Sequence, residues 1–590
     1  MSETVDQYLL LRALVDELAR CGLAGACTSP GSRSTPLVLT LARHDRVPTW
    51  SHVDERCAAF FALGVAKATG RPAAIACTSG TAAANYLPAI IEAREARVPL
   101  IVLTTDRPPE LRDIGAGQTI DQVKLFGDAV KWFVEVGTHP ATPDRLRWIR
   151  QLACRAMWTA VDGRPGVVHL NLALREPLVL TQDLPDEETV GGGGRADGRP
   201  WVSRSPASTG GAAGTGPGSA SEALRPILGA ASRGVIVAGR DERGGGTAGL
   251  AAAAFAEAVG WPLLADPLSG ARRGSAAVAH WDLMLRHEGF AGATVPDVVL
   301  RVGDLPTSKS LRAWLANPAI GVQVVLDAED AWQDPTGRID LRLPFSAGPA
   351  LAAAVAGGGL PVGPQAWLDA WRAADQRTAG AIARAGGDDL TEVRVAAELG
   401  ARLPAAATLF VAASMPIRDV ESFFPVREDG PRVLANRGAN GIDGTTSTAF
   451  GVAAGSAGPV VLLVGDVTLA HDLGGLLAAH RLRLPLTIVV VDNGGGGIFD
   501  FLPVASQRDA FEEHVATPTG LDPAHVAQLF GLEHRLADSV TEFRAALDHG
   551  LASDGVTLIE VRSDRSQNVR LHRRISDAVV AELSGPATSA

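Results

Sequence analysis

The sequence has little lysine, few cysteines and no excess of positive charge, and each shortage narrows the range of functions. Only four of the 54 basic residues in this 590-residue chain are lysine: Lys67, Lys124, Lys131 and Lys309. GC-rich coding explains that total, but it does not explain where particular arginines lie. The formal net charge is −11. Because nucleic-acid binding needs a basic surface, we expect no nucleic-acid partner.

No segment is predicted to cross a membrane or to act as a secretory signal. The long uncharged stretch at 345–368 is broken by a glycine triplet and prolines, so it cannot form one apolar helix. The first residues lack a basic region and an apolar region. The five cysteines have no ligand-like spacing, which indicates reduced thiols. We therefore expect a cytoplasmic protein without integral membrane association.

Helix and strand signals alternate along the chain, which predicts an α/β fold with three doubly wound parallel sheets. We expect a first unit at 1–185, a flexible glycine-rich linker at 186–220, a central Rossmann-like unit at 221–357, a connecting segment at 358–390 and a third unit at 391–590. The predicted strands are 24–28, 73–77, 100–104, 167–172, 235–238, 262–265, 298–302, 322–326, 408–411, 433–435, 460–464, 487–491 and 557–561. The main predicted helices are 5–21, 58–68, 81–92 and 469–481.

The segment from Gly465 to Phe499 predicts a phosphate and metal site. One buried strand ends at Gly465-Asp466, and the next ends at Asp492-Asn493. A right-handed crossover places both strand ends at the same sheet edge, where ligands bind in open α/β folds. The oxygens of Asp466, Asn493 and the Gly495 carbonyl suit Mg²⁺, and the following helix start with Thr468 suits a diphosphate. By themselves, these residues fit a helix cap and a glycine loop equally well.

The spacing is more specific. Gly-Asp, 26 intervening residues and Asn resembles the cofactor motif of the thiamin diphosphate-dependent enzymes. In that superfamily the motif begins Gly-Asp-Gly and ends Asn-Asn. Here Val467 replaces the third glycine and Asp492 the first asparagine, whereas both metal-binding side chains are retained.

The first unit contains a matching acid. Glu55 precedes an apolar helix, and alone it would be interpreted as a first-turn acid that complements the helix dipole. That helix is followed by a strand and by Ser79-Gly80-Thr81, an order that resembles the pyrimidine-binding domain of the superfamily. There, a buried glutamate bonds the aminopyrimidine and promotes proton removal from the thiazolium carbon, while the Ser-Gly backbone approaches the cofactor.

Several arginines occur in turns instead of on solvated helix faces, and arginine pairs with carboxylates in a bidentate fork. The turns are Ser29-Pro30-Gly31-Ser32-Arg33, Thr105-Asp106-Arg107, Ser414-Met415-Pro416-Ile417-Arg418 and Asn436-Arg437-Gly438, with Gln118 in Gly117-Gln118-Thr119. These phrases resemble the 2-succinyl-5-enolpyruvyl-6-hydroxy-3-cyclohexene-1-carboxylate synthase (MenD) family. The resemblance covers nearly the whole chain, from Ser29 to Arg565.

The resemblance implies a role for each residue in turn. Glu55 would activate thiamin diphosphate, and Mg²⁺ or Mn²⁺ would bind Asp466, Asn493 and the Gly495 carbonyl. The rest of the cofactor site would be Ser79, Gly80, Ser414, Gly441, Ile442, Gly465, Val467, Thr468, Ile498 and Phe499, with Ile442 as an apolar buttress. Isochorismate would bind Ser32, Arg33, Arg107 and Lys309. The carboxylate and reacting carbons of 2-oxoglutarate would meet Gln118, Ser414, Arg418 and Arg437, beside an apolar wall of Ile498 and Phe499. The catalytic set would be Glu55, Gln118, Arg418 and Arg437.

Some positions depart from the family pattern. Ser310 follows Lys309 where some relatives have arginine, Gly117 precedes Gln118 where an asparagine can stand, and Asp492 and Gly494 flank the metal asparagine. In the central unit, Gly239 to Gly246 does not match Gly-x-Gly-x-x-Gly, so we expect no nucleotide fingerprint there.

The implied reaction is decarboxylation of 2-oxoglutarate and conjugate addition of the succinyl carbanion equivalent to isochorismate, a step of menaquinone biosynthesis. A homodimer or homotetramer is also implied, because in this superfamily the glutamate-bearing domain of one subunit meets the diphosphate domain of another. Two alternatives remain. One is another thiamin diphosphate carboligase or decarboxylase, such as an acetolactate synthase, which accepts smaller or neutral donors. The other is a binding protein that kept only the fold.

Overall fold

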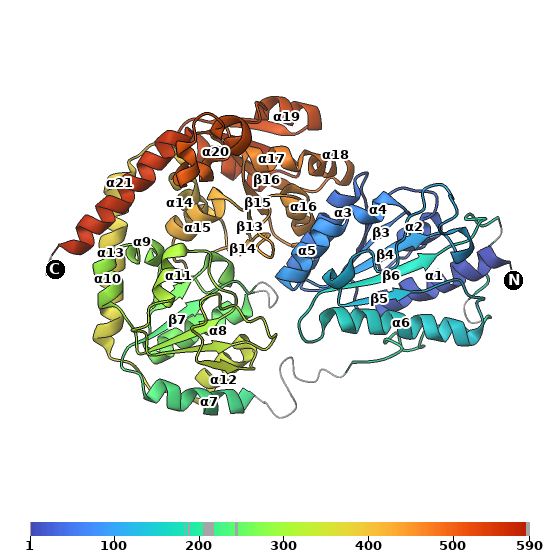
Figure 1. The fold of residues 1–590 in the computed structure, drawn as a ribbon, viewed down its shortest axis with the longest axis horizontal. Coiled ribbons are helices and arrows are strands. Elements are labelled where there is room, and N and C mark those ends of the chain that lie inside the picture. Colours follow the sequence, from blue (N-terminus) through green and yellow to red (C-terminus); the bar gives the residue numbers. More distant parts are fainter. Residues whose placement is uncertain (1, 182, 187–188, 205–216, 242–245, 586–590) are drawn as a thin grey trace. The chain divides into compact units, whose positions relative to one another are not determined.

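Three six-stranded, fully parallel sheets form the framework of the protein (Figure 1). The computed structural model describes residues 2–181, 183–186, 189–204, 217–241 and 246–585. The expected fold class is confirmed. The structure divides into two compact units. The first holds the first sheet and also 436–457 and 471–484, and the second holds the other two sheets.

The first sheet has the order β2-β1-β3-β4-β6-β5. Helices α1, α2 and α6 pack on one face, and α3 and α5 pack on the other. The strands are β1 (Ala26–Thr28), β2 (Thr49–Ser51), β3 (Ala73–Cys77), β4 (Leu100–Asp106), β5 (Trp132–Glu135) and β6 (Val167–Ala173). The helices are α1 (Glu3–Arg20), α2 (Thr35–Ala42), α3 (Glu55–Thr69), α4 (Thr81–Ala84), α5 (Leu87–Ala96) and α6 (Pro143–Val161).

The second sheet has the order β12-β11-β10-β7-β8-β9. One face is covered by α7, α8 and α12, and the other by α9, α11 and α13. The strands are β7 (Gly234–Ala238), β8 (Leu263–Ala265), β9 (Ala277–Val278), β10 (Val298–Val302), β11 (Val322–Leu326) and β12 (Leu341–Leu343). The helices are α7 (Pro217–Gly229), α8 (Thr247–Val259), α9 (Trp281–Met284), α10 (Glu288–Ala293), α11 (Lys309–Leu315), α12 (Ala347–Gly357) and α13 (Gln365–Gly386).

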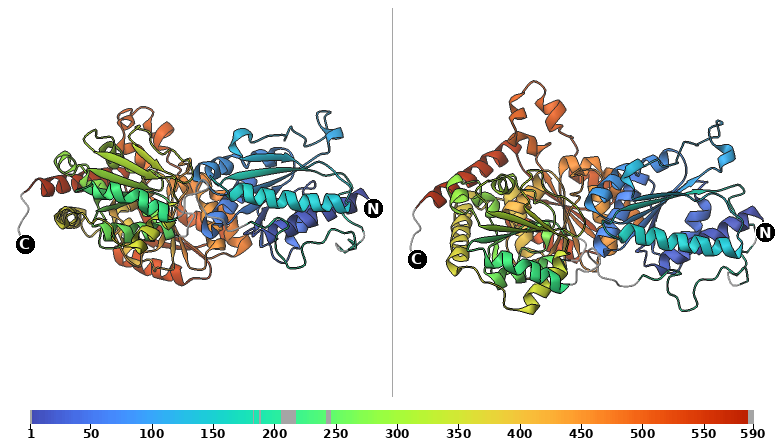
Figure 2. Two further views of the ribbon diagram at one scale, coloured as in Figure 1. Left: turned by 90° about the horizontal axis from the view of Figure 1, so that it is seen from below. Right: turned by 60° about the horizontal axis from the view of Figure 1, so that its bottom comes forward.

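The third sheet has the order β14-β13-β15-β16-β18-β17. Helices α14, α15, α20 and α21 share one apolar core with its central strands. The strands are β13 (Thr408–Val411), β14 (Arg432–Leu434), β15 (Val460–Gly465), β16 (Leu486–Asp492), β17 (Glu533–Ala537) and β18 (Val556–Arg562). The helices are α14 (Glu392–Arg402), α15 (Met415–Phe423), α17 (Asp466–His471), α19 (Pro523–Phe530), α20 (Val540–Ala552) and α21 (Arg565–Ser584). The long helices α13 and α21 run side by side in this unit (Figure 1 and Figure 2).

Two predicted helices are wrong in their continuity. The helix expected at 469–481 is split into α17, the 3₁₀ turn η4 (Leu473–Leu476) and α18 (Leu477–Leu482). Gly474 and Gly475 weaken the helix there, and the buried Asp472 side chain accepts the Ser447 N–H at 2.7 Å. The helix expected at 81–92 is likewise divided into α4 and α5, which starts afresh with a proline in its first turn.

Helix α3 packs directly on α16 (Thr445–Gly455) within the first unit. Two glycines allow this approach. A Cβ on Gly64 would lie 2.1 Å from the Thr448 carbonyl oxygen, and one on Gly451 would lie 1.9 Å from the Phe61 carbonyl oxygen. The two helix backbones therefore touch, so the helix that starts at Glu55 is fixed against the helix that follows Ile442.

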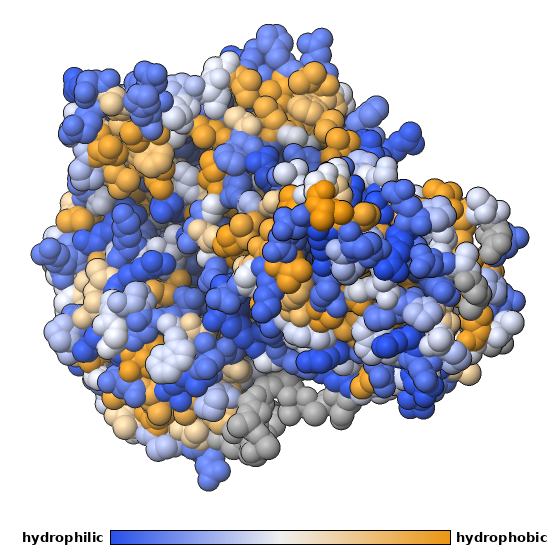
Figure 3. Space-filling view, turned by 45° about the vertical axis from the view of Figure 1, so that its right-hand side comes forward, coloured by the Kyte–Doolittle hydropathy of each residue, from blue (hydrophilic) through white to orange (hydrophobic). Residues whose placement is uncertain are grey.

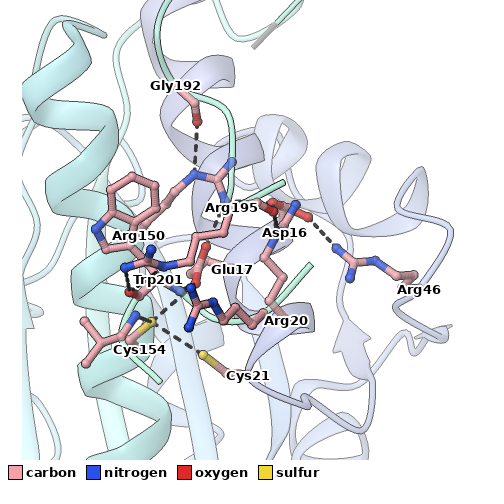
Figure 4. A network of polar contacts seen from close by, with 12 residues as sticks. Asp16, Glu17, Arg20, Cys21, Arg46, Arg150, Cys154, Gly192, Arg195 and Trp201 are labelled. Atoms are coloured by element: carbon pink, nitrogen blue, oxygen red, sulfur yellow. Dashed lines mark hydrogen bonds and ion pairs between the residues drawn. The ribbon is translucent and has the colours of Figure 1, made fainter. Parts of the chain in front are cut away.

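A buried ion-pair network attaches the chain after the first sheet to α1 and α6 (Figure 4). The Arg150 guanidinium donates to Asp16 at 2.7 Å, to Glu17 at 2.9 Å and to the Gly192 carbonyl at 3.0 Å. The Trp201 N–H also donates to Glu17. This part of the expected flexible linker is therefore hydrogen-bonded to the first unit. Residues 187–188 and 205–216 of that linker, like 242–245 in the glycine-rich segment of the central unit, lie outside the described residues.

Hydrophilic side chains predominate on the face shown in Figure 3, where apolar residues form separate patches. Among the residues that the structure describes, no helix combines the length and the apolarity needed to span a membrane.

We expect Arg150→Met to lower the free energy of unfolding by about 3–5 kcal/mol, because it leaves the fully buried Glu17 carboxylate without its cation. Chemical denaturation measures this. The matched control is Arg147→Met on the same helix, whose partner Asp144 is 89% exposed in its side chain. We expect the control to cost less than about 1 kcal/mol. Equal losses for the two variants would contradict the structural importance of the network.

Candidate active site

The carboxyl ends of β15 and β16 bring the predicted metal ligands to one sheet edge. The strands pair in parallel with Gly465 opposite Val491, so Asp466 and Asn493 leave the sheet at neighbouring positions. A cavity of about 500 Å³, counting its open mouth, lies here. Its lining includes Glu392, Ser414, Met415, Pro416, Asp419, Gly465, Asp466, Val467, Thr468, Asn493, Gly495, Gly496 and Gly497. Most residues predicted for the diphosphate and metal therefore share one cavity.

The Asp466 carboxyl is 7% exposed, and burial raises its pKa to about 6. The neighbouring Asp492 carboxylate raises this pKa further, whereas the N–H groups of Val467 and Gly495 lower it. Two carboxyls in a partly buried edge disfavour negative charge, so a bound cation would stabilise the ionised form of Asp466.

The Asn493 amide is held in one orientation. Its Nδ2 donates to the Glu392 carboxylate at 3.0 Å, and the Ser563 hydroxyl donates to the same oxygen at 3.0 Å. Its buried Oδ1 has no hydrogen-bond partner among the described residues. Burial raises the pKa of Glu392 to about 7, and Asp419 adds to this rise. An unpartnered buried acceptor is costly, which is expected at a position that a ligand completes.

The loop after Asn493 requires glycine. Gly494 and Gly495 have φ of 74° and 137°, in the region that side chains disfavour. A Cβ on Gly495 would also lie 2.8 Å from the Ala516 carbonyl oxygen. An aspartate carboxylate, an unpartnered amide oxygen and a loop carbonyl are hard oxygen donors, so the residues present fit Mg²⁺ bound together with a diphosphate.

Ser414 joins β13 to α15 with a positive φ of 75°. Such a conformation is strained for serine and is found at functional sites. The Arg418 guanidinium, one turn into α15, donates to the Ser414 carbonyl at 2.5 Å. Lys309 is the first residue of α11 and is exposed. Ile498 and the 37%-exposed Phe499 lie in the 3₁₀ turn η5 (Gly497–Phe501).

In the first unit, Ser79, Arg107 and Gln118 form one hydrogen-bonded group. The Arg107 guanidinium donates to the Ser79 hydroxyl and, at 2.6 Å, to the Gln118 carbonyl. The Gln118 side-chain amide donates to the Ser79 carbonyl at 2.9 Å. Gly80 has a φ of 84° and its N–H donates to Gln122. These predicted residues are therefore brought together by the structure.

Arg33 belongs to the same group electrostatically. Burial lowers the pKa of Arg107, and the nearby Arg33 charge lowers it further. Arg33 donates to the Leu174 carbonyl at 2.8 Å and to Glu176 at 3.0 Å, whereas its buried Nε has no partner among the described residues. Ser32 beside it is exposed. Two neighbouring guanidinium groups with an open donor favour an anionic ligand.

Glu55 starts α3, whose N-terminus is capped by the Asp54 carboxylate through the Arg56 and Cys57 N–H groups. Its charge raises the pKa values of Cys77 and Tyr86, after the larger effect of burial. Glu55 therefore lies within electrostatic reach of the buried Cys77 thiol and Tyr86 hydroxyl.

The loop with Arg437, Gly441 and Ile442 is also in the first unit. The buried Glu92 carboxylate accepts the N–H groups of Gly438 at 2.8 Å and Ala439 at 2.6 Å. A Cβ on Gly438 would lie 2.6 Å from the Glu92 carbonyl oxygen, so this loop lies flat on α5. Ile442 is half-buried.

Comparison with known proteins assigns these features to a family. Three family models match, described as the "N-terminal TPP binding domain" (10–125), the "middle domain of thiamine pyrophosphate" (228–411) and the "C-terminal TPP binding domain" (418–561) of thiamine pyrophosphate enzymes. Two similar proteins are named 2-succinyl-5-enolpyruvyl-6-hydroxy-3-cyclohexene-1-carboxylate synthase. The one from Geobacillus kaustophilus is 44% identical over 97% of this chain and 98% of that protein. The one from Chloroflexus aurantiacus is 44% identical over 95% of this chain and 94% of that protein. The chain belongs to this MenD family of thiamin diphosphate enzymes.

A solved structure of a different enzyme shares the fold of this chain. Benzoylformate decarboxylase from Polynucleobacter necessarius superposes with a TM-score of 0.70 over 94% of this chain and 98% of that one, at 16% identity.

A third sequence relative, from Halobacterium salinarum, is also named 2-succinyl-5-enolpyruvyl-6-hydroxy-3-cyclohexene-1-carboxylate synthase. It is 41% identical over 97% of this chain and 98% of that protein. The thiamin diphosphate-binding domains predicted from Gly465-Asp466 and Glu55 are thus confirmed as domains, whereas the roles of single residues stay predictions.

Sequence reasoning missed the buried acids that hold the site residues in place. Glu392 supports Asn493, and Glu92 supports the loop before Ile442. Asp282 accepts the hydroxyls of Ser308 and Ser422, and Glu421 accepts the Ser308 N–H. Glu392 directly follows the helix-capping Thr391, so its sequence signal was that of an ordinary helix start.

We expect Asn493→Ala to weaken Mg²⁺-dependent binding of thiamin diphosphate by at least about tenfold, because loss of an outer partner alone costs about 10- to 100-fold. Glu392→Ala, which removes the partner of the Asn493 amide, should weaken this binding by about 10- to 100-fold. Calorimetric titration at fixed Mg²⁺ measures both. Asp492→Asn is the control and should keep the affinity within about threefold, since Asp492 is predicted not to bind the metal. Unchanged affinity in Asn493→Ala would contradict its role as a ligand.

Proposed function

We propose that this chain is a transferase that decarboxylates 2-oxoglutarate and adds the resulting four-carbon unit to isochorismate. The product is 2-succinyl-5-enolpyruvyl-6-hydroxy-3-cyclohexene-1-carboxylate, an intermediate of menaquinone biosynthesis. The observation that supports this most directly is the group of Arg33, Arg107, Ser79 and Gln118, because it places two guanidinium ions at the predicted cofactor turn. Substrates with several carboxylates need such positive charge. A decarboxylase whose 2-oxo acid has an uncharged side chain does not need it.

The proposed cofactor is thiamin diphosphate with Mg²⁺ or Mn²⁺. When bound, it supplies a nucleophilic carbon and accepts the electrons released as CO₂ leaves. Asp466, Asn493 and the Gly495 carbonyl would hold the metal, and Gly465, Val467 and Thr468 would surround the diphosphate. Glu55 would hold a proton at the aminopyrimidine, while Ser79, Gly80, Ser414, Gly441 and Ile442 would fix the ring system.

The substrate residues act by charge and orientation. Ser32, Arg33, Arg107 and Lys309 would bind isochorismate, and Gln118, Ser414, Arg418 and Arg437 would bind 2-oxoglutarate. The guanidinium groups at each substrate would neutralise carboxylates that would otherwise repel one another. Ile498 and Phe499 would exclude water from the reacting carbons.

We also propose self-association into a homodimer or homotetramer and a cytoplasmic location. The assembly follows from the superfamily arrangement in which two subunits complete each cofactor site. Light scattering on the purified protein, with and without cofactor, measures the assembly.

The decisive assay mixes the protein with thiamin diphosphate, Mg²⁺, 2-oxoglutarate and isochorismate. We expect isochorismate to be consumed only when the donor and the cofactor are present, and the product mass to show loss of one CO₂. Turnover of pyruvate in place of 2-oxoglutarate would instead favour an acetolactate synthase-like enzyme. Failure to bind thiamin diphosphate would favour a binding protein that kept only the fold.

We expect Glu55→Gln to reduce turnover by about 10²- to 10⁴-fold, the range for loss of a group that transfers a proton. Initial rates at saturating substrates measure this. The control is Glu95→Gln on α5, whose side chain is 44% exposed and pairs with an exposed arginine. Full activity in Glu55→Gln would refute the proposed activation of the cofactor.

A further inference from the structure

A buried carboxylate in the second unit connects two helices that carry predicted substrate residues. Asp282, in α9, is 4% exposed. Its Oδ1 accepts the hydroxyls of Ser308 at 2.5 Å and Ser310 at 2.8 Å. Its Oδ2 accepts the Ser422 hydroxyl at 2.8 Å and the Arg286 guanidinium at 2.6 Å. The two oxygens of Asp282 thus hold different segments.

These segments are the start of α11 and the last turn of α15. Ser308 is the N-cap of α11 and accepts the Leu311 N–H at 3.1 Å, so its position determines the first turn, which begins with Lys309. Ser422 lies four residues after Arg418 in α15, on the same side of that helix. Asp282 therefore anchors the backbone near both cations, although its carboxylate is hydrogen-bonded to other residues of the described chain, namely Ser308, Ser310, Ser422 and Arg286.

Ser310 takes part in the same anchor. Its hydroxyl also donates to the Asp282 main-chain carbonyl at 2.9 Å and lies 2.9 Å from the Ser308 hydroxyl. Ser310 thus supplies an additional hydrogen bond to the carboxylate that accepts the Ser308 hydroxyl.

Glu421 makes a second connection between the same segments. Its carboxyl accepts the Ser308 N–H at 3.0 Å, and the buried Arg272 guanidinium donates to the carbonyls of Val420 and Glu421 at 3.0 and 2.6 Å. Burial, with Asp266 and Asp282 nearby, raises the pKa of Glu421 well above its usual range. Burial also acts to raise the pKa of Asp282, but Arg286 and the serine hydroxyls outweigh it and hold that pKa below its usual range. The surroundings therefore favour the charged form of Asp282 more than that of Glu421.

Cations of the two helices lie within electrostatic reach of each other. Burial lowers the pKa of Arg418, Glu421 and Asp419 oppose this, and Arg312, one turn after Lys309, lowers it further. The Arg312 Nε is held by the Pro306 carbonyl at 2.8 Å. Like charges within electrostatic reach repel, so an anchored backbone is needed to keep them together, and together they suit ligands with several carboxylates.

We propose that Asp282 is a positioning residue that holds Lys309 of α11 in register with Arg418 of α15, so that the two polycarboxylate substrates are bound next to each other. This inference rests on the proposed function, in which Lys309 binds isochorismate and Arg418 binds 2-oxoglutarate. Asp282 itself would touch no substrate and would act through the first turn of α11.

The test compares Asp282→Asn with the parent enzyme in steady-state kinetics. We expect the KM for isochorismate to rise about tenfold while kcat changes less than about threefold, since contacting pairs couple at this level. In a Lys309→Met background, Asp282→Asn should add less than about twofold, because its effect passes through Lys309. Equal effects in both backgrounds, or an unchanged KM, would overturn the inference. If Asp282→Asn does not fold, Ser310→Ala removes only the contacts of one hydroxyl and should shift KM in the same direction by about threefold.

The matched control is Asp16→Asn in the first unit, a largely buried aspartate that pairs with Arg20, Arg46 and Arg150. It should lower the thermal midpoint without changing the KM for isochorismate. An equal rise of KM in this control would show that Asp282→Asn acts through general destabilisation and would overturn the inference.

Two measurements without turnover separate this inference from the proposed function. Amide exchange at Ser308 and Leu311 should speed up in Asp282→Asn with no ligand present, and unchanged exchange would refute the anchor. Because lysine is scarce, acetylation followed by mass spectrometry reports on Lys309 individually, with Lys124 as the internal reference. Isochorismate should protect Lys309 in the parent protein and protect it less in Asp282→Asn. Equal protection in both would refute the positioning role. Absence of protection in the parent would refute the substrate role of Lys309, while the exchange result would still decide whether Asp282 anchors the turn.

Discussion

The parallel pairing of β15 with β16 is the constraint on which the candidate active site depends. With Gly465 opposite Val491, the residues that follow each strand emerge at one level of one edge. A shift of one residue would turn Asp466 and Asn493 toward opposite faces of the sheet. Both strands are buried along their central residues, so apolar packing on both faces holds the register. The geometry of the site therefore depends on the core behind it.

Buried carboxylates perform the next level of positioning. Glu392, Glu92 and Asp282 each accept hydrogen bonds from a segment that carries predicted ligand residues. Burying such a group is favourable only when its oxygens are satisfied, and that condition is met in one arrangement of the loop. These buried carboxylates thereby hold in one conformation loops that would be mobile if they were only exposed to solvent. The arrangement costs desolvation energy and provides preorganised donors, which is what electrostatic stabilisation of charged substrates requires.

The central strands could be predicted within about two residues because each is a continuous apolar run that is covered on both faces. β15 and β16 extend the expected strands by one residue at one or both ends. Edge strands such as β2 and β17 were not predicted, since they are partly exposed and β17 mixes charged with apolar residues.

The same contrast applies to the site. Asp466 and Asn493 belong to a spaced motif, and the structure places both at one cavity. Glu392 and Glu421 could not be predicted, because their partners lie 101 and 113 residues away in the chain and no local pattern links them. Nor could the breaks in the helices at 81–92 and 469–481 be read from periodicity, because they depend on tertiary hydrogen bonds and on proline and glycine positions.

The contact between α3 and α16 restricts how far these two helices of the first unit can shift relative to each other. Most helix pairs meet through side chains, which can change rotamer and let the axes drift by an ångström or more as sequences diverge. Gly64 and Gly451 leave no side chain to adjust, so the separation of these axes is limited by backbone atoms in contact. Divergence of the surrounding core would then alter the angle between the helices before it alters their spacing. Residues around Glu55 and Ile442 can therefore be substituted while the distance between α3 and α16 stays the same.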